Sequence, residues 1–144
     1  MFVVATANDV SQLPPELLRK GRLDEIFYVD LPSEEERGEI FRIHLAKRGR
    51  DPKNFDLPAL VARSKDFSGA EIEESINSAL YDAFYAKQEL ATAHVLTALG
   101  QSVPMAKTMI EKVSAQRAWA AGRARNASVI QPVKIEQEMR RMEL

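Results

Sequence analysis

The spacing of apolar positions divides the chain into a short extended region and a following series of helices. Phe2–Ala5 is a continuous apolar run with β-branched residues, which is typical of a strand covered on both faces in a parallel sheet. Ile26–Val29 predicts a second strand, stopped by Pro32. Pro14–Leu18 predicts a short helix that Gly21 can end. Two strands and one short helix do not make a core, so we expect them to need sheet neighbours.

After Pro32 the apolar spacing becomes helical. Ser33–Glu36 and Ser68–Glu71 are both Ser-x-x-Glu capping boxes, in which each side chain bonds a backbone N–H at the start of a helix. The first box predicts a helix to about Arg48, and Asp56 and Thr92 predict caps for two further helices. Four helices in about 70 residues are typical of a small bundle. The predicted buried positions are Ile40, Phe41, His44, Leu45, Leu60, Val61, Ile72, Ile76, Ala79, Leu80, Ala83, Phe84, Val95, Leu96 and Leu99.

The charge changes sign near Pro104. Residues 1–103 carry a net charge of −5, whereas residues 104–144 carry 8 basic and 4 acidic side chains. A fifth helix is predicted from Met105, so the basic region reads as a helical appendage. The expected parts of the chain are therefore residues 1–32, a partial core; residues 33–104, a helical domain; and residues 105–144, a basic helical extension.

Composition narrows the class of protein. A hydrophobic share of 45% and a charged share of 28% over 144 residues are those of a soluble globular protein. No apolar run approaches the roughly 18 residues of a membrane helix, and the first residues lack a secretory signal. The absence of cysteine excludes disulfides, thiol nucleophiles and cysteine zinc sites. We expect a cytoplasmic protein without a membrane partner, and the net charge of −1 argues against nucleic acid.

Three polar residues near the start of the chain could carry chemistry. An amide such as Asn8 at the carboxyl end of a buried strand lies where open α/β sheets bind ligands, although an Asn-Asp turn is the alternative. Arg19 and Arg22 are three residues apart on a predicted short helix and can face one way. Guanidinium groups suit the charge on a transferring phosphoryl group, but two solvated arginines beside a glycine are the commoner case.

Three residues of the predicted bundle form a second candidate group. His44 lies on an apolar stripe, where a histidine is usually a core residue but could approach an adenine or ribose. Gly69 and Ala70 occupy the first turn of a capped helix, and small residues there let a ligand approach closely. Ordinary cap chemistry is the alternative for these two positions. No residue pattern predicts a metal site.

In their order along the chain these segments resemble the AAA family of P-loop ATPases over about residues 1–103. Val4–Asn8 matches the sensor-1 pattern and Leu13–Asp24 the arginine-finger region. Asp30–Pro32 leads into the helical lid, as it does in the family. Ile43–Leu45 matches the segment around the lid histidine, and Phe67–Ile72 matches the lid motif beside the adenine.

The resemblance implies a role for each candidate residue. Asn8 would act as the sensor-1 residue, orienting the attacking water. Arg19 and Arg22 would be arginine fingers that reach the nucleotide of a neighbouring subunit in a ring. The nucleotide contacts implied in the lid are His44, Gly69 and Ala70. The implied cofactors are ATP and Mg²⁺ in the intact parent, and the implied partners are copies of the same chain and an unknown protein substrate that the ring remodels.

The sequence also departs from the family. It holds no Gly-x-x-x-x-Gly-Lys-Ser/Thr loop and no strand that ends in paired acidic residues. Ala70 stands where other branches carry a sensor-2 arginine, and Lys20 where many relatives have proline. We therefore expect a mostly α-helical chain: the C-terminal fragment of an αβα domain with about two strands, a four-helix lid and an extension. Alone, it is expected to be inactive and to bind no nucleotide tightly.

The sequence of these motifs is most similar to that of uncharacterised bacterial and plastid AAA ATPases related to FtsH. FtsH itself is not expected, because its zinc protease requires His-Glu-x-x-His and the histidines here are His44 and His94. The alternative is a non-catalytic interaction module that self-associates through its orphan strands and helices. Its basic tail could add a surface that binds a partner. A solvated helix face is the more common explanation of such a tail, and nucleic-acid binding is a weaker alternative. The arginines of that tail are Arg123, Arg125, Arg140 and Arg141.

Overall fold

The computed structural model describes residues 1–19 and 21–128, which form two compact units. One unit is Met1–Asp30 together with the described residues after Arg117, and the other is Leu31–Arg117. Lys20 and the part of the expected extension from residue 129 onward, with Arg140 and Arg141, lie outside the described residues. None of the described helices has the length and apolar character that crossing a membrane requires.

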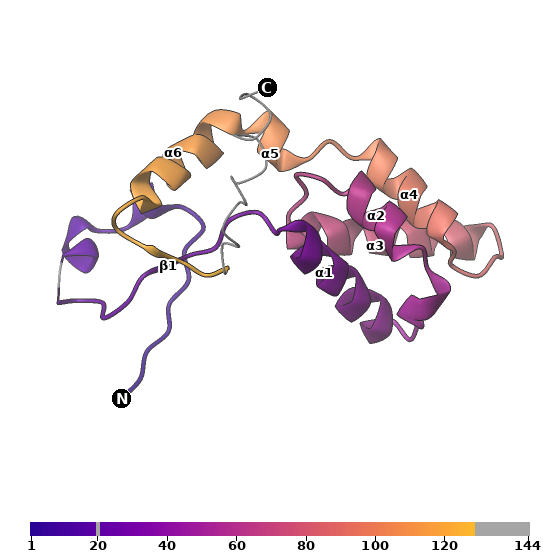
Figure 1. The fold of residues 1–144 in the computed structure, drawn as a ribbon, viewed down its shortest axis with the longest axis horizontal. Coiled ribbons are helices and arrows are strands. Elements are labelled where there is room, and N and C mark those ends of the chain that lie inside the picture. Colours follow the sequence, from indigo (N-terminus) through magenta and orange to yellow (C-terminus); the bar gives the residue numbers. More distant parts are fainter. Residues whose placement is uncertain (20, 129–144) are drawn as a thin grey trace, which may run out of the picture. The chain divides into compact units, whose positions relative to one another are not determined.

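The second unit contains a bundle of four helices, as the capping boxes predict (Figure 1). Helix α1 packs against α2 and α3, and α4 packs against α2 and α3. The core contains Phe41, Leu60, Ile76 and Val95, one from each helix, and none of the four has exposed surface. The bounds are α1, Glu34–Lys47; α2, Leu57–Arg63; α3, Gly69–Tyr85; and α4, Thr92–Gln101.

Both Ser-x-x-Glu boxes form. Ser33 Oγ accepts the N–H of Glu36 at 3.2 Å, and the Glu36 carboxylate accepts the N–H of Ser33 at 2.8 Å. Ser68 and Glu71 make the same reciprocal pair at the start of α3. These bonds satisfy backbone donors that have no partner within the helix, which is why both helices begin where the sequence indicates.

Two details of the bundle differ from the sequence prediction. Phe84 is 85% exposed, because it lies roughly 100° around α3 from the centre of the stripe formed by Ile72, Ile76 and Ala83. Thr92 does not cap α4: its hydroxyl accepts the N–H of Asp56 at 3.0 Å instead. α4 begins after Ala91, whose side chain makes no capping hydrogen bond, and the ring of His94 accepts the N–H of Ala91 at 3.1 Å. Ile40, Leu80, Leu96 and His44 are only partly buried.

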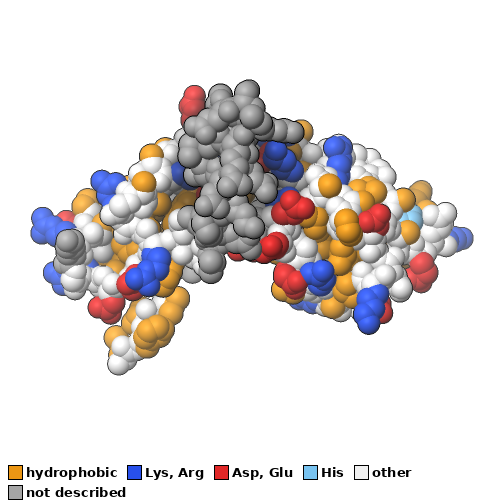
Figure 2. All heavy atoms as spheres, viewed as in Figure 1, with side chains coloured by type: hydrophobic (Ala, Val, Ile, Leu, Met, Phe, Trp, Pro, Cys, Tyr) orange, Lys and Arg blue, Asp and Glu red, His pale blue; other side chains and the backbone are white. Residues whose placement is uncertain are grey.

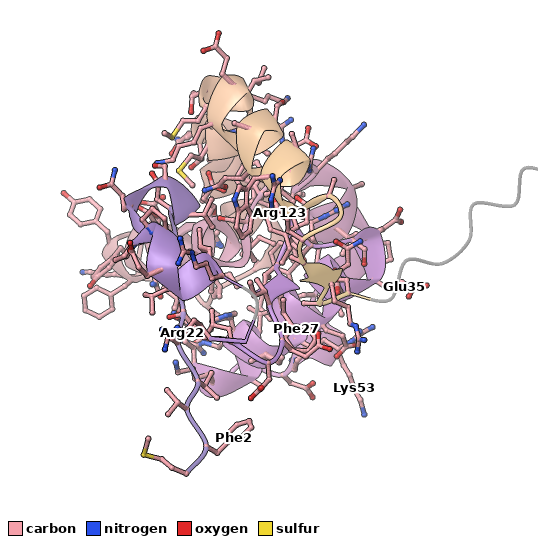
Figure 3. All side chains as sticks on the ribbon, turned by 90° about the vertical axis from the view of Figure 1, so that its left-hand side faces the viewer. Phe2, Arg22, Phe27, Glu35, Lys53 and Arg123 are labelled. Carbon is pink, nitrogen blue, oxygen red and sulfur yellow. The ribbon has the colours of Figure 1, made fainter. Side chains whose placement is uncertain are left out.

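The expected strand at Phe2–Ala5 is not formed. The segment is extended but carries no strand pairing, and Phe2 is 93% exposed at its end (Figure 3). Figure 2 shows hydrophobic side chains gathered along this segment. A strand requires hydrogen-bonding neighbours, and the described residues supply none for these positions.

The second predicted strand is present but short. β1, Phe27–Tyr28, pairs in parallel with β2, Arg125–Asn126, a strand that the apolar pattern did not indicate. Backbone N–H groups of Arg125 and Ala127 donate to Ile26 and Tyr28 at 2.9 Å. Pairing by backbone groups needs no apolar side chain, which explains why hydrophobic periodicity missed β2.

The remaining elements are three 3-10 helices and two further α-helices, among the residues that the structure describes. The 3-10 helices η1, Val10–Gln12, and η2, Pro15–Leu18, precede Gly21, whose φ of +89° suits glycine. A third 3-10 helix, η3, spans Pro52–Asn54. The fifth predicted helix is divided at Met109, which leaves the helical conformation between α5, Met105–Thr108, and α6, Ile110–Ala120.

Candidate functional site

The structure places the six predicted site residues in two groups. Asn8, Arg19 and Arg22 belong to the first unit and are exposed. Arg19 and Arg22 do not lie on the predicted short helix, because η2 ends at Leu18. They lie on the turn that follows it, in which the N–H of Arg22 donates to the carbonyl of Arg19 at 3.2 Å. The turn precedes β1 and carries both guanidinium groups into solvent. The other group, His44, Gly69 and Ala70, belongs to the second unit.

Helices α1 and α3 run in the same direction where they carry the second group. A Cβ on Gly69 would lie 3.6 Å from Ile40 Cδ1, which marks the first point of contact. One turn further along both helices, His44 Nδ1 lies 3.3 Å from Glu73 Oε1. Another turn on, Arg48 Nε donates to Asn77 Oδ1 at 2.7 Å. This register sets His44 one helical turn, about 5.4 Å, from the level of Gly69.

Arg48 organises the polar end of this register. It donates to Glu73 Oε1 at 3.0 Å and to the carbonyl of His44 at 3.0 Å, besides its bond to Asn77. The bond from Arg48 holds the pKa of Glu73 below its ordinary range, against desolvation, and the charges of His44 and Lys47 add to the effect. Because His44 Nδ1 also lies 3.3 Å from Arg48 Nη1, the imidazole is held in place by both helices. No pattern in the sequence indicated the contacts between the two helices, since the polar residues that they join are 25 to 29 positions apart and follow no periodicity.

Gly69 and Ala70 form the first turn of α3. Gly69 is half-buried against Ile40, and Ala70 is exposed. A Cβ on Gly69 would make an ordinary van der Waals contact, so glycine is not required there by packing within the unit. The turn is open on the Ala70 side, and backbone N–H groups at a helix N-terminus favour anionic groups. Among the described residues, no cluster of acidic or histidine side chains could hold a metal ion.

The chain is similar to known AAA proteins over most of its length. It is 49% identical over 131 residues to the uncharacterised AAA domain-containing protein ycf46 of Pyropia yezoensis, which covers 90% of this chain and 27% of that protein. A ycf46 protein of Guillardia theta is 48% identical over 130 residues, covering 89% of this chain and 26% of that protein. The chain thus spans about a quarter of the length of these curated relatives.

The chain belongs to the AAA family. It is also related to FtsH: the ATP-dependent zinc metalloprotease FtsH of Mycoplasmopsis synoviae is 42% identical over 80 residues, which is 56% of this AAA chain and 12% of that protein. The proteasome-activating nucleotidase of Sulfurisphaera tokodaii is 42% identical over 81 residues, or 56% of this chain and 20% of that protein. No family model matches the chain, and no solved structure matches it.

Glu71 has a second role in the AAA chain that the capping box alone did not predict. Its Oε2 accepts the N–H and the hydroxyl of Ser68 at 2.8 and 2.7 Å. Its Oε1 accepts the N–H of Met105, the first residue of α5, at 2.7 Å. Desolvation raises the pKa of Glu71, but these hydrogen bonds outweigh it and lower the pKa below 4.5. One carboxylate thus joins the Gly69–Ala70 turn to the start of the extension.

The lowered pKa of Glu71 predicts a pH effect on stability. The charged carboxylate stabilises the fold at pH values above 4.5, and this contribution is lost as the pH falls through the lower folded-state pKa. Glu71→Gln removes at least one acceptor, so we expect a loss of about 1 kcal/mol in unfolding free energy at neutral pH and a smaller loss below pH 4.5. Urea denaturation of the wild type and the variant, at neutral pH and below pH 4.5, measures the two losses.

Glu36→Gln is the matched control, because Glu36 forms the same kind of box at the start of α1. Hydrogen exchange separates the two variants: the Met105 amide is expected to exchange faster in Glu71→Gln and unchanged in Glu36→Gln. Equal protection of that amide in both variants would show that the Met105 bond contributes nothing.

Proposed function

We propose that this chain supplies the sensor residue, the trans-acting arginines and the nucleotide-facing lid of an AAA ATPase. In the parent protein, Asn8 orients the attacking water, and His44, Gly69 and Ala70 contact the nucleotide. ATP and Mg²⁺ are the cofactors, and the ring remodels a protein partner. A cytoplasmic setting is part of the proposal.

The register between α1 and α3 is the observation that carries the proposal. It sets a histidine held by Arg48 and Glu73 one turn from an open, glycine-containing helix N-terminus. An imidazole and a set of backbone N–H groups at that spacing suit a ligand with an aromatic base and an anionic phosphate. The similarity to AAA proteins over 131 residues supports the same ligand class.

The exposed turn of Arg19 and Arg22 supports action in trans. In the described structure neither guanidinium makes an ion pair within its own unit, so both can reach the nucleotide of a neighbouring subunit. A donor face and an acceptor face that differ produce a head-to-tail ring. Hydrolysis then shifts the lid against the core and moves the bound partner.

Mixing of subunits tests the trans arrangement. In the parent ATPase, a subunit with Arg19→Ala and Arg22→Ala and a subunit unable to bind Mg–ATP are each expected to be inactive alone. Mixed rings are expected to regain turnover, because a subunit with intact arginines then adjoins a subunit with an intact nucleotide site. Failure of mixed rings to hydrolyse ATP, with mixing proved by light scattering or cross-linking, would contradict the trans role.

The 144-residue chain alone is expected to hydrolyse no ATP. Its sequence has no loop to cradle the β- and γ-phosphates, and catalysis of phosphoryl transfer depends on that positioning. Mg²⁺-dependent phosphate release from the purified chain measures this. The control is Asn8→Ala: contaminating activity is the same in both preparations, whereas turnover that falls in the variant would belong to the chain and contradict the prediction.

A second candidate function is self-association through unpaired strands. Phe2, Val3 and Val4 are 93%, 70% and 76% exposed, and an apolar extended segment is a template for pairing with another chain. Val3→Lys places a charge in this segment and is expected to abolish such pairing. Light scattering of the wild-type chain and of Val3→Lys tests this function, since a strictly monomeric wild-type chain excludes it.

A further inference from the structure

The outer face of α3 carries three aromatic side chains that its own bundle does not cover. Tyr81, Phe84 and Tyr85 are 76%, 85% and 92% exposed, all within the last two turns of the helix. Each aromatic side chain can bury about 150–250 Å² on contact. Three together make a patch of several hundred Å², the size at which exposed apolar surface marks an interaction site.

The same face is negatively charged. α3 contains four acidic residues and no Lys, Arg or His. Glu74 lies within about 20° of Tyr81 around the helix, and Asp82 lies within about 60° of Tyr85. Glu73 is neutralised by Arg48, but Glu74 and Asp82 form no ion pair with any residue that the structure describes. Aromatic rings bind guanidinium and ammonium groups over their faces, and the two carboxylates favour the same charge. The face therefore suits a basic partner.

The chain itself carries a segment of opposite charge. Five basic residues and a single acidic one, Glu111, lie between Pro104 and Ser128. We name this the basic segment. Its cationic residues, all exposed, are Lys107, Lys112, Arg117, Arg123 and Arg125.

Within one copy, the start of the basic segment is held away from the aromatic face. The N–H of Met105 is bonded to Glu71, in the first turn of α3. Tyr81 and Tyr85 lie 10 and 14 residues further along, about 15–21 Å at 1.5 Å per residue. Lys107 is only two residues from Met105, so it is held near the opposite end of α3. The basic segment of another copy has no such restraint.

We propose that the outer face of α3, formed by Glu74, Tyr81, Asp82, Phe84 and Tyr85, binds the basic segment of a second copy of this chain. The contact is head-to-tail, because the two surfaces differ. The aromatic rings provide the buried centre, and the charges provide orientation and association rate. This contact goes beyond the proposed ATPase function, since it involves neither the nucleotide nor Arg19 and Arg22.

Sedimentation velocity of the full 144-residue chain tests the contact. Self-association is expected at about 0.15 M salt and is expected to weaken at about 1 M, where the screening length falls from about 8 to about 3 Å. Tyr81→Ser with Tyr85→Ser is expected to weaken it by about tenfold or more without a change in net charge. Circular dichroism verifies the fold, and both positions are exposed in the structure.

Charge reversal identifies the two partner surfaces. Glu74→Lys with Asp82→Lys, and separately Lys107→Glu with Lys112→Glu, are each expected to be monomeric. An equimolar mixture is expected to associate again, because each altered surface then meets one of opposite charge. Glu16→Lys with Glu39→Lys makes the same change in net charge outside α3 and is expected to associate as the wild type does.

Two results would overturn the proposal. One is a wild-type chain that stays monomeric at every concentration and salt tested. The other is association that the α3 variants leave unchanged, including association that only Val3→Lys abolishes. Neither result bears on nucleotide hydrolysis by the parent ATPase, which the mixed-ring experiment tests separately.

Discussion

Replacing Arg19 and Arg22 together by alanine in the parent ATPase is expected to lower kcat by on the order of 10³–10⁵-fold. In the proposed role, each planar guanidinium would bind the oxygens of the transferring phosphoryl group and stabilise charge that develops only in the transition state. Nucleotide affinity is therefore expected to change little. Steady-state turnover and nucleotide titration of the same preparation measure the two quantities.

The fold is expected to tolerate this change. Both side chains are exposed, and the hydrogen bond between the two residues joins backbone atoms, which alanine keeps. Arg42→Ala is the matched control, because Arg42 is an exposed arginine whose ion pair with Glu39 lies on the surface. Lysine at positions 19 and 22 keeps the charge but not the bidentate hydrogen-bonding geometry of guanidinium, so it is expected to restore activity only in part. An alanine variant that retains the wild-type kcat would exclude both residues as arginine fingers.

Phe41→Ala is expected to destabilise the helical unit by about 3–5 kcal/mol. Phe41 has no exposed surface and lies among core residues contributed by the other three helices of the bundle. Its removal loses apolar burial and leaves a cavity that the surrounding helices fill incompletely. Because total stabilities are commonly about 5–15 kcal/mol, this loss is enough to unfold much of a small domain. Chemical denaturation followed by circular dichroism measures it.

Phe84→Ala is the control for the same chemical change. Phe84 is 85% exposed, so its truncation is expected to shift the unfolding free energy by at most about 0.5 kcal/mol. The comparison also tests the sequence pattern, which predicted that both Phe41 and Phe84 are buried. Similar losses of unfolding free energy in the two variants would mean that Phe84 is covered in the folded protein. That result would contradict the exposure of the outer face of α3.

The bundle followed from the sequence because its signals are local. Ser33 with Glu36 and Ser68 with Glu71 satisfy backbone donors within one turn, so the start of each helix is determined by four consecutive residues. The apolar stripe of α3 likewise depends only on helical spacing. The sequence prediction failed at Phe84, which lies beside this stripe rather than on it, and at Thr92, whose hydroxyl bonds Asp56 instead of capping α4.

The candidate site was predictable only in its parts. Asn8, Arg19, Arg22, His44, Gly69 and Ala70 were each identified along the chain from the residues and the AAA resemblance, and their roles remain proposals. The sequence did not indicate that Glu73 contacts His44, or that Glu71 reaches Met105, since these two pairs join residues distant in sequence. Periodicity reports which face of a helix is apolar and carries no information about which helix it meets.

The sequence by itself determined the AAA family resemblance, the four helices of the bundle and the starts of α1 and α3. Only the tertiary structure decided which segments pair and which stay exposed. Phe2–Ala5 has the composition of a buried strand, yet it is exposed because burial depends on neighbours that a local pattern cannot supply. Arg125–Asn126 has no strand pattern, yet it pairs with β1 because its backbone groups meet those of Ile26 and Tyr28. Hydrogen-bonding partners distant in sequence, rather than local preference, made that difference.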